Sequence, residues 1–461
     1  GDDSIAIAGA VSTSLYGGVG NDRISISGGV TSDFLYGGDG NDSFVLNGVI
    51  SDTLVDTGSG VDSVDLNTGA GSSSNLTLTG ALTSTSVTGG AGGDTILVTP
   101  AVTSGYFDLG AGADSLFFSS TVNAATIVGA AGTDTVSLSG ANDYLVLAGV
   151  SNDYVFAGSG NDTLSVNGAT AVSTSLYGDA GDDSIVVAAT ASTNLVKVYT
   201  GAGNDSVRFT AATAGNTNLE VSADATDSTT VTGNKTVVFN SGTFSTVTVN
   251  TGSGADSIIF QSAVNGATIT TNSGNDSVRF QDLVSGTSNI NLGAGADYLF
   301  VEDRMVASIV TGDAGADTFS LKTLSASTIL GGDDADSVNI YGSLIGSKID
   351  FGAGNELFTL TVDSSLSIID GGADNDTFVF TTATTLTNST ITGGSGNDSI
   401  TLANALTSGS VSGGAGNDSI TFGGAVVSAN INTVGDAGSD LLVFSSTVSA
   451  SGINGNTGID T

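Results

Sequence analysis

The 461-residue sequence contains no cysteine, histidine or tryptophan, one proline, and eight lysine and arginine residues in total. Without cysteine there are no disulfides or thiolate sites. Without histidine, histidine-based zinc sites and the commonest general base are excluded. Binding to nucleic acid needs clusters of basic residues, so nucleic acid is not an expected partner. No run of about 18 apolar residues occurs, so no membrane insertion is expected in this segment.

Acidic residues, glycine and small apolar residues dominate instead. The chain has 46 aspartate and glutamate residues and a formal net charge of −38, together with 68 glycines. A chain with this charge repels itself and should expand. Yet 39% of the residues are hydrophobic, which is too many for a disordered acidic tail. The two properties are compatible if cations neutralise the carboxylates.

A short motif, Gly-(Gly)-x-Gly-(Asn)-Asp, recurs along the chain, for example at 17–22, 37–42 and 413–418. Within each run of copies the closing aspartates are 19 to 22 residues apart, and a fixed period of this size identifies a repeat protein. Glu356 replaces the aspartate in one copy. The closing residues are Asp3, Asp22, Asp42, Asp62, Asp94, Asp114, Asp134, Asp162, Asp183, Asp205, Asp256, Asp276, Asp297, Asp317, Asp336, Asp376, Asp398, Asp418, Asp440 and Asp460.

Alternating apolar and polar residues follow each motif, as in 4–7, 206–209 and 399–402. This period of two predicts a half-buried strand with its apolar side chains inward, and it places Arg23, Arg208 and Arg279 outward. A looser corner and a second strand, such as 14–16 or 328–330, complete the unit. We therefore predict an all-β fold: a right-handed parallel β-helix or β-roll solenoid with about 20 residues per coil, forming one extended rod.

The motif has the chemistry of a calcium-binding turn. Glycine permits a positive φ, so that the backbone carbonyls can be directed at one point, and the aspartate adds an anionic oxygen. Calcium takes about 6 to 8 oxygen ligands, which two turns stacked one coil apart can supply and one turn cannot. Multiple calcium ions would also balance the net charge. The alternative is that Gly-Asn-Asp forms a tight turn without an ion.

These turns, each followed by an alternating strand, resemble the haemolysin-type calcium-binding repeats, also called RTX repeats. The resemblance implies a parallel β-roll in which aspartate carboxylates and turn carbonyls bind calcium, with the closing aspartates above as ligands. One difference is clear: the family's unit is nine residues long and gives calcium turns on both edges of a coil. Here only one corner of each coil carries the motif, so we expect one column of ions at a time.

Three longer steps interrupt the repeat, between Asp62 and Asp94, Asp134 and Asp162, and Asp205 and Asp256. Their lengths are close to one and a half, one and a half, and two and a half coils. One hypothesis is that the ion column changes edge at each break; the alternative is a surface loop that leaves the column in place. The middle break contains two further candidate ligands in the nonapeptide rhythm, Asp143 and Asp153.

The third break is the segment poorest in the motif, with Lys235 where an aspartate would stand, and we expect it to be free of calcium. The expected organisation is a calcium-turn solenoid over 1–205, with breaks near 63–93 and 135–161, then motif-poor coils over 206–255 and a regular calcium-turn solenoid over 256–461. Because both ends fall within a motif, we expect the solenoid to continue into a longer chain at both ends.

No catalytic constellation is visible, so we do not expect an enzyme. The composition favours a secreted bacterial protein of the cell surface, such as a surface-layer (S-layer) or sheath component that is folded and rigidified by calcium. Its expected partners are copies of itself, other surface-layer components or surface glycans. Two alternatives are the stalk of a large calcium-dependent adhesin and the RTX tail of a secreted enzyme or toxin. Thr246-Val247-Thr248 and Thr390-Ile391-Thr392 suggest a threonine ladder of the kind that an ice-binding face would show. Such a face is disfavoured because the ladder is interrupted by Ser14, Asp33, Ser308 and Lys348.

Overall fold

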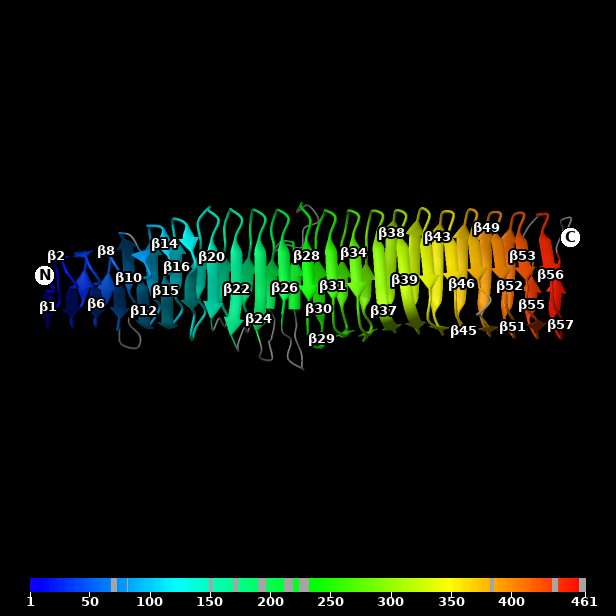
Figure 1. Cartoon of the computed structure of the whole chain (residues 1–461), viewed down its shortest axis with the longest axis horizontal. Coiled ribbons are helices and arrows are strands. Elements are labelled where there is room, and N and C mark those ends of the chain that lie inside the picture. The colour runs from blue at the N-terminus through cyan, green and yellow to red at the C-terminus, as the bar shows by residue number, and fades with distance from the viewer. Residues whose placement is uncertain are drawn as a thin grey trace. The chain divides into compact units, whose positions relative to one another are not determined.

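The computed structural model describes residues 1–67, 73–80, 82–148, 152–168, 173–189, 196–210, 219–223, 232–381, 385–432 and 438–455. All regular secondary structure in these ranges is β-strand (Figure 1). The chain divides into two compact units, Gly1–Thr236 and Val237–Thr461, and each is considered by itself. Among the described residues, no helix suited to crossing a membrane is found.

Two parallel sheets form the first unit, and the chain alternates between them. The first sheet contains β1 (Ser4–Ile7), β3 (Arg23–Ile26), β6 (Ser43–Leu46), β9 (Ser63–Leu66), β12 (Ser86–Ala91), β15 (Tyr106–Ala111), β18 (Ala125–Val128), β20 (Tyr144–Ala148), β22 (Thr163–Gly168), β24 (Ser184–Ala189), β26 (Ser206–Phe209) and the start of β28 (Thr236–Phe239). The second sheet contains β2 (Leu15–Val19), β5 (Phe34–Asp39), β8 (Thr53–Ser59), β10 (Asn75–Thr79), β13 (Thr95–Val98), β16 (Ser115–Phe118), β19 (Thr135–Ser137), β21 (Tyr154–Phe156), β23 (Ser175–Tyr177), β25 (Val196–Tyr199) and β27 (Leu219–Ser222). Short corner strands are β4 (Val30–Thr31), β7 (Ile50–Ser51), β11 (Leu82–Thr83), β14 (Val102–Thr103) and β17 (Val122–Asn123).

The second unit repeats this alternation. Its first sheet contains β31 (Ser257–Phe260), β34 (Ser277–Phe280), β37 (Tyr298–Val306), β39 (Thr318–Ser325), β41 (Ser337–Ile340), β44 (Leu357–Leu360), β47 (Thr377–Phe380), β50 (Ser399–Leu402), β53 (Ser419–Phe422) and β56 (Leu441–Phe444). Its second sheet contains β30 (Val247–Asn250), β33 (Thr268–Thr270), β36 (Asn289–Asn291), β38 (Ile309–Ala314), β40 (Thr328–Asp333), β43 (Lys348–Ala353), β46 (Ile368–Ala373), β49 (Thr390–Ser395), β52 (Ser410–Ala415), β55 (Asn430–Asn432) and β58 (Gly452–Asn454). Short strands that pair with the first sheet are β29 (Phe244–Ser245), β32 (Val264–Asn265), β35 (Val284–Ser285), β42 (Leu344–Ile345), β45 (Ser364–Ser365), β48 (Leu386–Thr387), β51 (Leu406–Thr407), β54 (Val426–Val427) and β57 (Val448–Ser449).

Parallel pairing brings equivalent residues of successive coils side by side. Ile5 pairs with Ile24, and Ser257 pairs with Ser277. This arrangement confirms the predicted all-β solenoid of parallel strands with about 20 residues per coil. The predicted alternation is also confirmed, because Ile24 and Ile26 are buried while Arg23 is exposed.

Inward side chains of successive coils stack into a continuous core. In the second unit the ring centroids of Phe260 and Phe280 lie 5.0 Å apart with nearly parallel planes. Such contacts bury large apolar surfaces in a coil too small to form a core alone. The corner predicted to be loose differs from expectation: many coils add a two-residue strand there, such as β42 and β45, which pair with each other.

Candidate metal-binding turns

Acidic residues form one uninterrupted column in the second unit. Each of them immediately precedes a first-sheet strand, and this corner is called the first-sheet edge. Strand pairing keeps their spacing at one residue per coil, so each coil contributes one rung. All are at most 5% exposed. The column consists of Asp256, Asp276, Asp297, Asp317, Asp336, Glu356, Asp376, Asp398, Asp418 and Asp440.

One oxygen of each carboxylate holds the neighbouring rung. The backbone N–H of Asp297 donates to Oδ1 of Asp317 at 2.8 Å, and that of Asp317 donates to Oδ1 of Asp336 at 2.8 Å. Glu356 keeps this pattern, since its Oε2 accepts the N–H of Asp336 at 2.7 Å. Hydrogen bonds to a charged acceptor are among the strong ones. The ladder therefore fixes the stacking of the turns, and glutamate can replace aspartate in it.

In most rungs the other carboxylate oxygen is buried and accepts no hydrogen bond from the described residues, although Oδ2 of Asp94 accepts the N–H of Gly90 at 3.2 Å. Leaving a buried acceptor without a donor is costly. Burial, with a smaller contribution from the neighbouring carboxylates, raises the pKa of Asp317 and of Asp336 to about 7. Without a cation, the charged forms of these two rungs are therefore disfavoured. The carboxylates whose Oδ2 is buried without a hydrogen-bond donor among the described residues are those of Asp22, Asp42, Asp114, Asp134, Asp143, Asp162, Asp183, Asp297, Asp317, Asp336, Asp376, Asp398 and Asp418.

Carbonyl oxygens of the next turn approach the same point. A Cβ added at Gly312 would lie 2.2 Å from Oδ2 of Asp317 and 2.4 Å from the carbonyl oxygen of Gly331. Only glycine fits there, because any side chain would occupy the place where these oxygens converge. Gly315, in the same turn, has a φ of 122°, a conformation that glycine adopts without strain. Stacked turns thus direct oxygens of two coils at one place.

This donor set fits calcium. No group of three acidic, histidine or cysteine side chains gathers anywhere in the described ranges, so the carbonyls must supply most of the ligands. Calcium accepts such a mixture of carboxylate and backbone carbonyl oxygens. A bound divalent ion would provide the positive partner that the second carboxylate oxygens lack. The sequence motif identified the aspartates but not which carbonyls face them, because that depends on the backbone path.

In the first unit the acidic column occurs in three runs. The first run, at the first-sheet edge, is Asp3, Asp22, Asp42 and Asp62, of which Asp3 is exposed. The second run, Asp94, Asp114, Asp134 and Asp153, precedes second-sheet strands and so lies at the second-sheet edge. The third run, Asp143, Asp162, Asp183 and Asp205, is again at the first-sheet edge. Asp460 lies outside the described residues.

Strand register shows where the aspartate column changes edge. Ser63, which follows Asp62, pairs with Ser86, which precedes the turn that ends at Asp94. The strand after one motif therefore stacks on the strand before the next. At the middle break, Asp134 donates its N–H to Asp153 at 3.0 Å while Asp143 donates to Asp162 at 2.7 Å on the other edge. For the positions of the aspartates, the edge-change hypothesis is confirmed at both breaks.

The hypothesis is wrong at the start of the third break. The N–H of Thr236 donates to the carbonyl of Asp205 at 2.8 Å, so Lys235 stands at the next rung of the same edge. Between them β27 still joins the second sheet, where Leu219 pairs with Val196. The step of 30 positions from Asp205 to Lys235 therefore advances the chain by one coil. The acidic segment 224–227, also part of this break, lies outside the described residues.

A comparison with protein-family models agrees with calcium binding at these turns. The family model for the RTX calcium-binding nonapeptide repeat matches four copies, in residues 16–48, 385–403 and 410–424. These residues therefore carry RTX repeats, as the sequence resemblance implied, and the repeats indicate calcium binding at multiple sites. No curated protein matches the chain.

Among solved structures, the chain is similar to a hyperactive, Ca²⁺-dependent, β-helical antifreeze protein from an Antarctic bacterium. The identity is 17% and the TM-score 0.42, and the match covers 66% of this chain and 80% of that one.

Proposed function

We propose that this chain is an extracellular structural segment of a cell-surface layer or sheath, which calcium folds and rigidifies. The observation that carries the proposal is the ladder of buried carboxylates, in which each rung holds its neighbour with one oxygen and offers the other to a cation. Neutralising such a column stiffens the stack, because each ion would join two successive coils. A stiff repetitive element is what a surface lattice requires.

Calcium concentration supports the extracellular location. Extracellular calcium modules bind at about 10⁻⁴ to 10⁻³ M, far above cytosolic calcium. RTX repeats are typical of secreted proteins, which agrees with this. The chain would stay expanded at low calcium, since 46 acidic residues face only eight basic ones, and would fold on reaching calcium outside the cell.

The carboxylates support a structural rather than a catalytic role. In successive rungs the buried carboxylate accepts a hydrogen bond from the backbone N–H of the preceding rung, as at Asp297, Asp317 and Asp336. The environment of the carboxylate is thus repeated from coil to coil, whereas a catalytic pair needs two distinct environments. The proposed partners are further copies of the chain or other lattice components, with calcium reducing the repulsion between acidic surfaces.

Two measurements test the proposal. Circular dichroism should show most of the β signal appear with millimolar calcium and disappear with chelator, and electron microscopy in calcium should show ordered sheets or filaments. An unchanged β signal after complete calcium removal would contradict calcium-dependent folding. Folded particles that stay monomeric at all concentrations in calcium would contradict the lattice role alone.

A further inference from the structure

Lys235 is the one basic residue found at a rung of the acidic columns in the described part of the chain. Its side chain is 1% exposed. Asn234, which precedes it, bonds to the preceding coil as other residues before the closing acid do. Its N–H donates to Oδ1 of Asn204 at 3.0 Å, and the N–H of Asn204 donates to Oδ1 of Asp182 at 2.8 Å. The turn therefore keeps Gly233 and Asn234 of the motif, while Val231 stands at its first position and Lys235 replaces the closing acid with a base.

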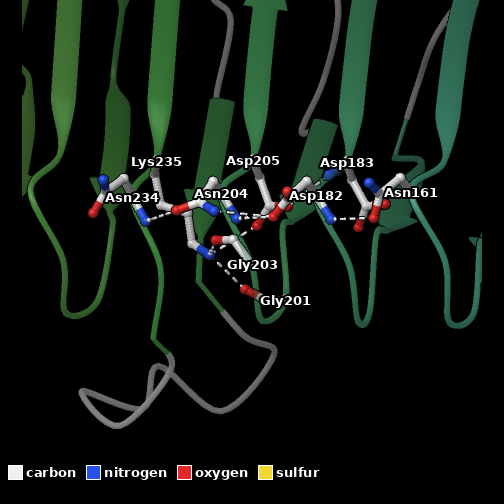
Figure 2. A network of polar contacts seen from close by, with 9 residues as sticks. All are labelled: Asn161, Asp182, Asp183, Gly201, Gly203, Asn204, Asp205, Asn234 and Lys235. Carbon is white, nitrogen blue, oxygen red and sulfur yellow. Dashed lines mark hydrogen bonds and ion pairs between the residues drawn. The ribbon is translucent and has the colours of Figure 1, made fainter.

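The ammonium group reaches back into the preceding turn. Nζ lies 2.7 Å from the carbonyl oxygen of Gly201, 2.7 Å from that of Gly203 and 2.7 Å from Oδ2 of Asp205 (Figure 2). Lysine has three N–H donors, and three oxygens receive them. Oδ1 of Asp205 still accepts the N–H of Asp183, at 2.9 Å, as the ladder requires.

Oδ2 of Asp205 is the atom that distinguishes this rung. In Asp162 and Asp183, two and one coils earlier, the corresponding oxygen is buried without a hydrogen-bond donor among the described residues. At Asp205 that oxygen is paired with a full positive charge inside the protein. The lysine therefore supplies locally what the other rungs require from solution.

We propose that Lys235 is a built-in replacement for calcium: its ammonium occupies the cation position of the turn formed by Gly201, Gly203 and Asp205. This rung then folds without a metal ion and does not bind one. It also identifies the ligands of the other turns: the carbonyls of the first and third positions of Gly-x-Gly-x-Asp and Oδ2 of the aspartate. The inference depends on calcium binding elsewhere in the chain, but not on a role at the cell surface.

A calcium-independent rung has a consequence for folding. When calcium is absent, most rungs carry buried carboxylates that repel one another, whereas the coils joined by Asp205 and Lys235 are already neutralised. These coils should stay structured under chelation and offer a template on which neighbouring coils stack when calcium arrives.

Hydrogen exchange of the unaltered chain in chelator tests this directly. The N–H groups of Ser206 and Thr236 donate to the carbonyls of Asp183 and Asp205 on either side of the lysine rung, and those of Ser43 and Ser63 make the same bonds at metal-type rungs. We expect Thr236 to exchange at least about tenfold more slowly than Ser43 and Ser63. Equal exchange at all these amides would overturn the proposal.

A charge-changing variant tests the metal side. Lys235→Asp restores the closing acid and removes the ammonium from the turn at 201–205, so calcium titration should show one more bound ion per chain and chelation should now release Thr236. The matched control is Lys322→Asp. Lys322 is half exposed, and its Nζ lies 3.8 Å from Oδ1 of the half-exposed Asp303. This substitution should change neither the number of bound ions nor the protection of Thr236. The same ion count for Lys235→Asp and the unaltered chain would overturn the proposal, whether or not the variant folds fully.

Lys235→Met removes the charge and keeps the length of the side chain. It should abolish the chelator-resistant protection of Thr236 without adding a high-affinity ion, and retained protection would count against the ammonium as the cause. A titration in which the unaltered chain binds no calcium at all would instead contradict the calcium-binding function, which separates the two failures.

Discussion

The second unit keeps its acidic column on one edge from Asp256 to Asp440, whereas the first unit moves the column twice and ends it on Lys235. Both units use the same coil, the same motif and the same backbone ladder. The difference shows that the edge carrying the acidic residues is not a property of the fold. It is set by where the motif falls within each coil, and a step of about one and a half coils transfers it to the other edge.

The second-sheet edge of the second unit explains how an edge can do without acidic residues. Ser327, Ser347 and Ser367 each precede a second-sheet strand, as the acids precede first-sheet strands. The Oγ of Ser347 accepts the N–H of Ser327 at 3.2 Å and donates to the carbonyl of Ile345 at 3.0 Å. A serine hydroxyl thus accepts the N–H of the neighbouring coil and donates its own proton within its turn, so both of its hydrogen-bonding roles are filled. A carboxylate accepts the same N–H with one oxygen and still has a second oxygen that needs a partner.

The largest expected effect separates the two units by calcium removal. In chelator the second unit should lose protection along its first-sheet edge, because the eight buried acidic rungs from Asp276 to Asp418 form no ion pair with lysine or arginine in the described ranges. The first unit should keep a protected segment around Asp205 and Lys235. Hydrogen exchange measured by mass spectrometry reports this protection. Magnesium added in place of calcium is the control, because magnesium dehydrates reluctantly and prefers stricter geometry than calcium. Uniform loss across both units would contradict Lys235 as an internal cation for its rung.

Substitution of a single rung should give opposite results with and without calcium. In Asp317→Asn the amide oxygen still accepts the N–H of Asp297, while the charge that helps to raise the pKa of Asp297 is removed. We expect a loss of about 1 to 3 kcal/mol of stability in calcium and a gain in chelator. Denaturant unfolding in both conditions measures it, with Asp303→Asn as an exposed control.

The same sign in both conditions would contradict a cation-binding role for Asp317. An equal loss of stability in both conditions would indicate that the carboxylate acts through its hydrogen bond alone.

Acidification should partly replace calcium. In the folded chain burial raises the pKa of Asp114 to about 6 and those of Asp276 and Asp376 to about 7, from an ordinary value of 3.8. A raised pKa means that the folded form binds protons more tightly than the unfolded form. Its stabilising contribution is complete below about pH 4 and disappears as the pH rises through about 6 to 7.

Chelated protein should therefore be more stable at about pH 5.5 than at pH 8. In the presence of calcium, the affinity for the ion should fall as the pH is lowered from 8 to about 5.5, because protons compete with calcium for the carboxylates. Thermal unfolding at several pH values, with and without chelator, measures both trends. A stability that rises with pH in chelator would contradict buried carboxylates as the cause.

Sequence reasoning reached the coil and the acidic rungs because both are periodic. Alternation placed Ile24 inward and Arg23 outward, and the constant step placed Asp297 and Asp317 in one column. It could not decide the third break, since loop length does not show whether a segment closes a half coil or a whole one. It also missed the serine ladder, because serine is common at exposed corners and only the structure shows that Ser347 is buried.

The smallest expected effect concerns that serine ladder. Ser347→Ala removes the acceptor for the N–H of Ser327 and the donor to the carbonyl of Ile345, so we expect a loss of about 1 to 2 kcal/mol. Because no charge is involved, the loss should be the same at every calcium concentration at which the second unit is folded, and calcium affinity should not change. Ser343→Ala, at a less buried corner position, is the matched control. If the cost of Ser347→Ala instead grew as calcium was withdrawn, the two edges would be energetically coupled, and the metal-free edge could no longer be treated as an independent support of the coil.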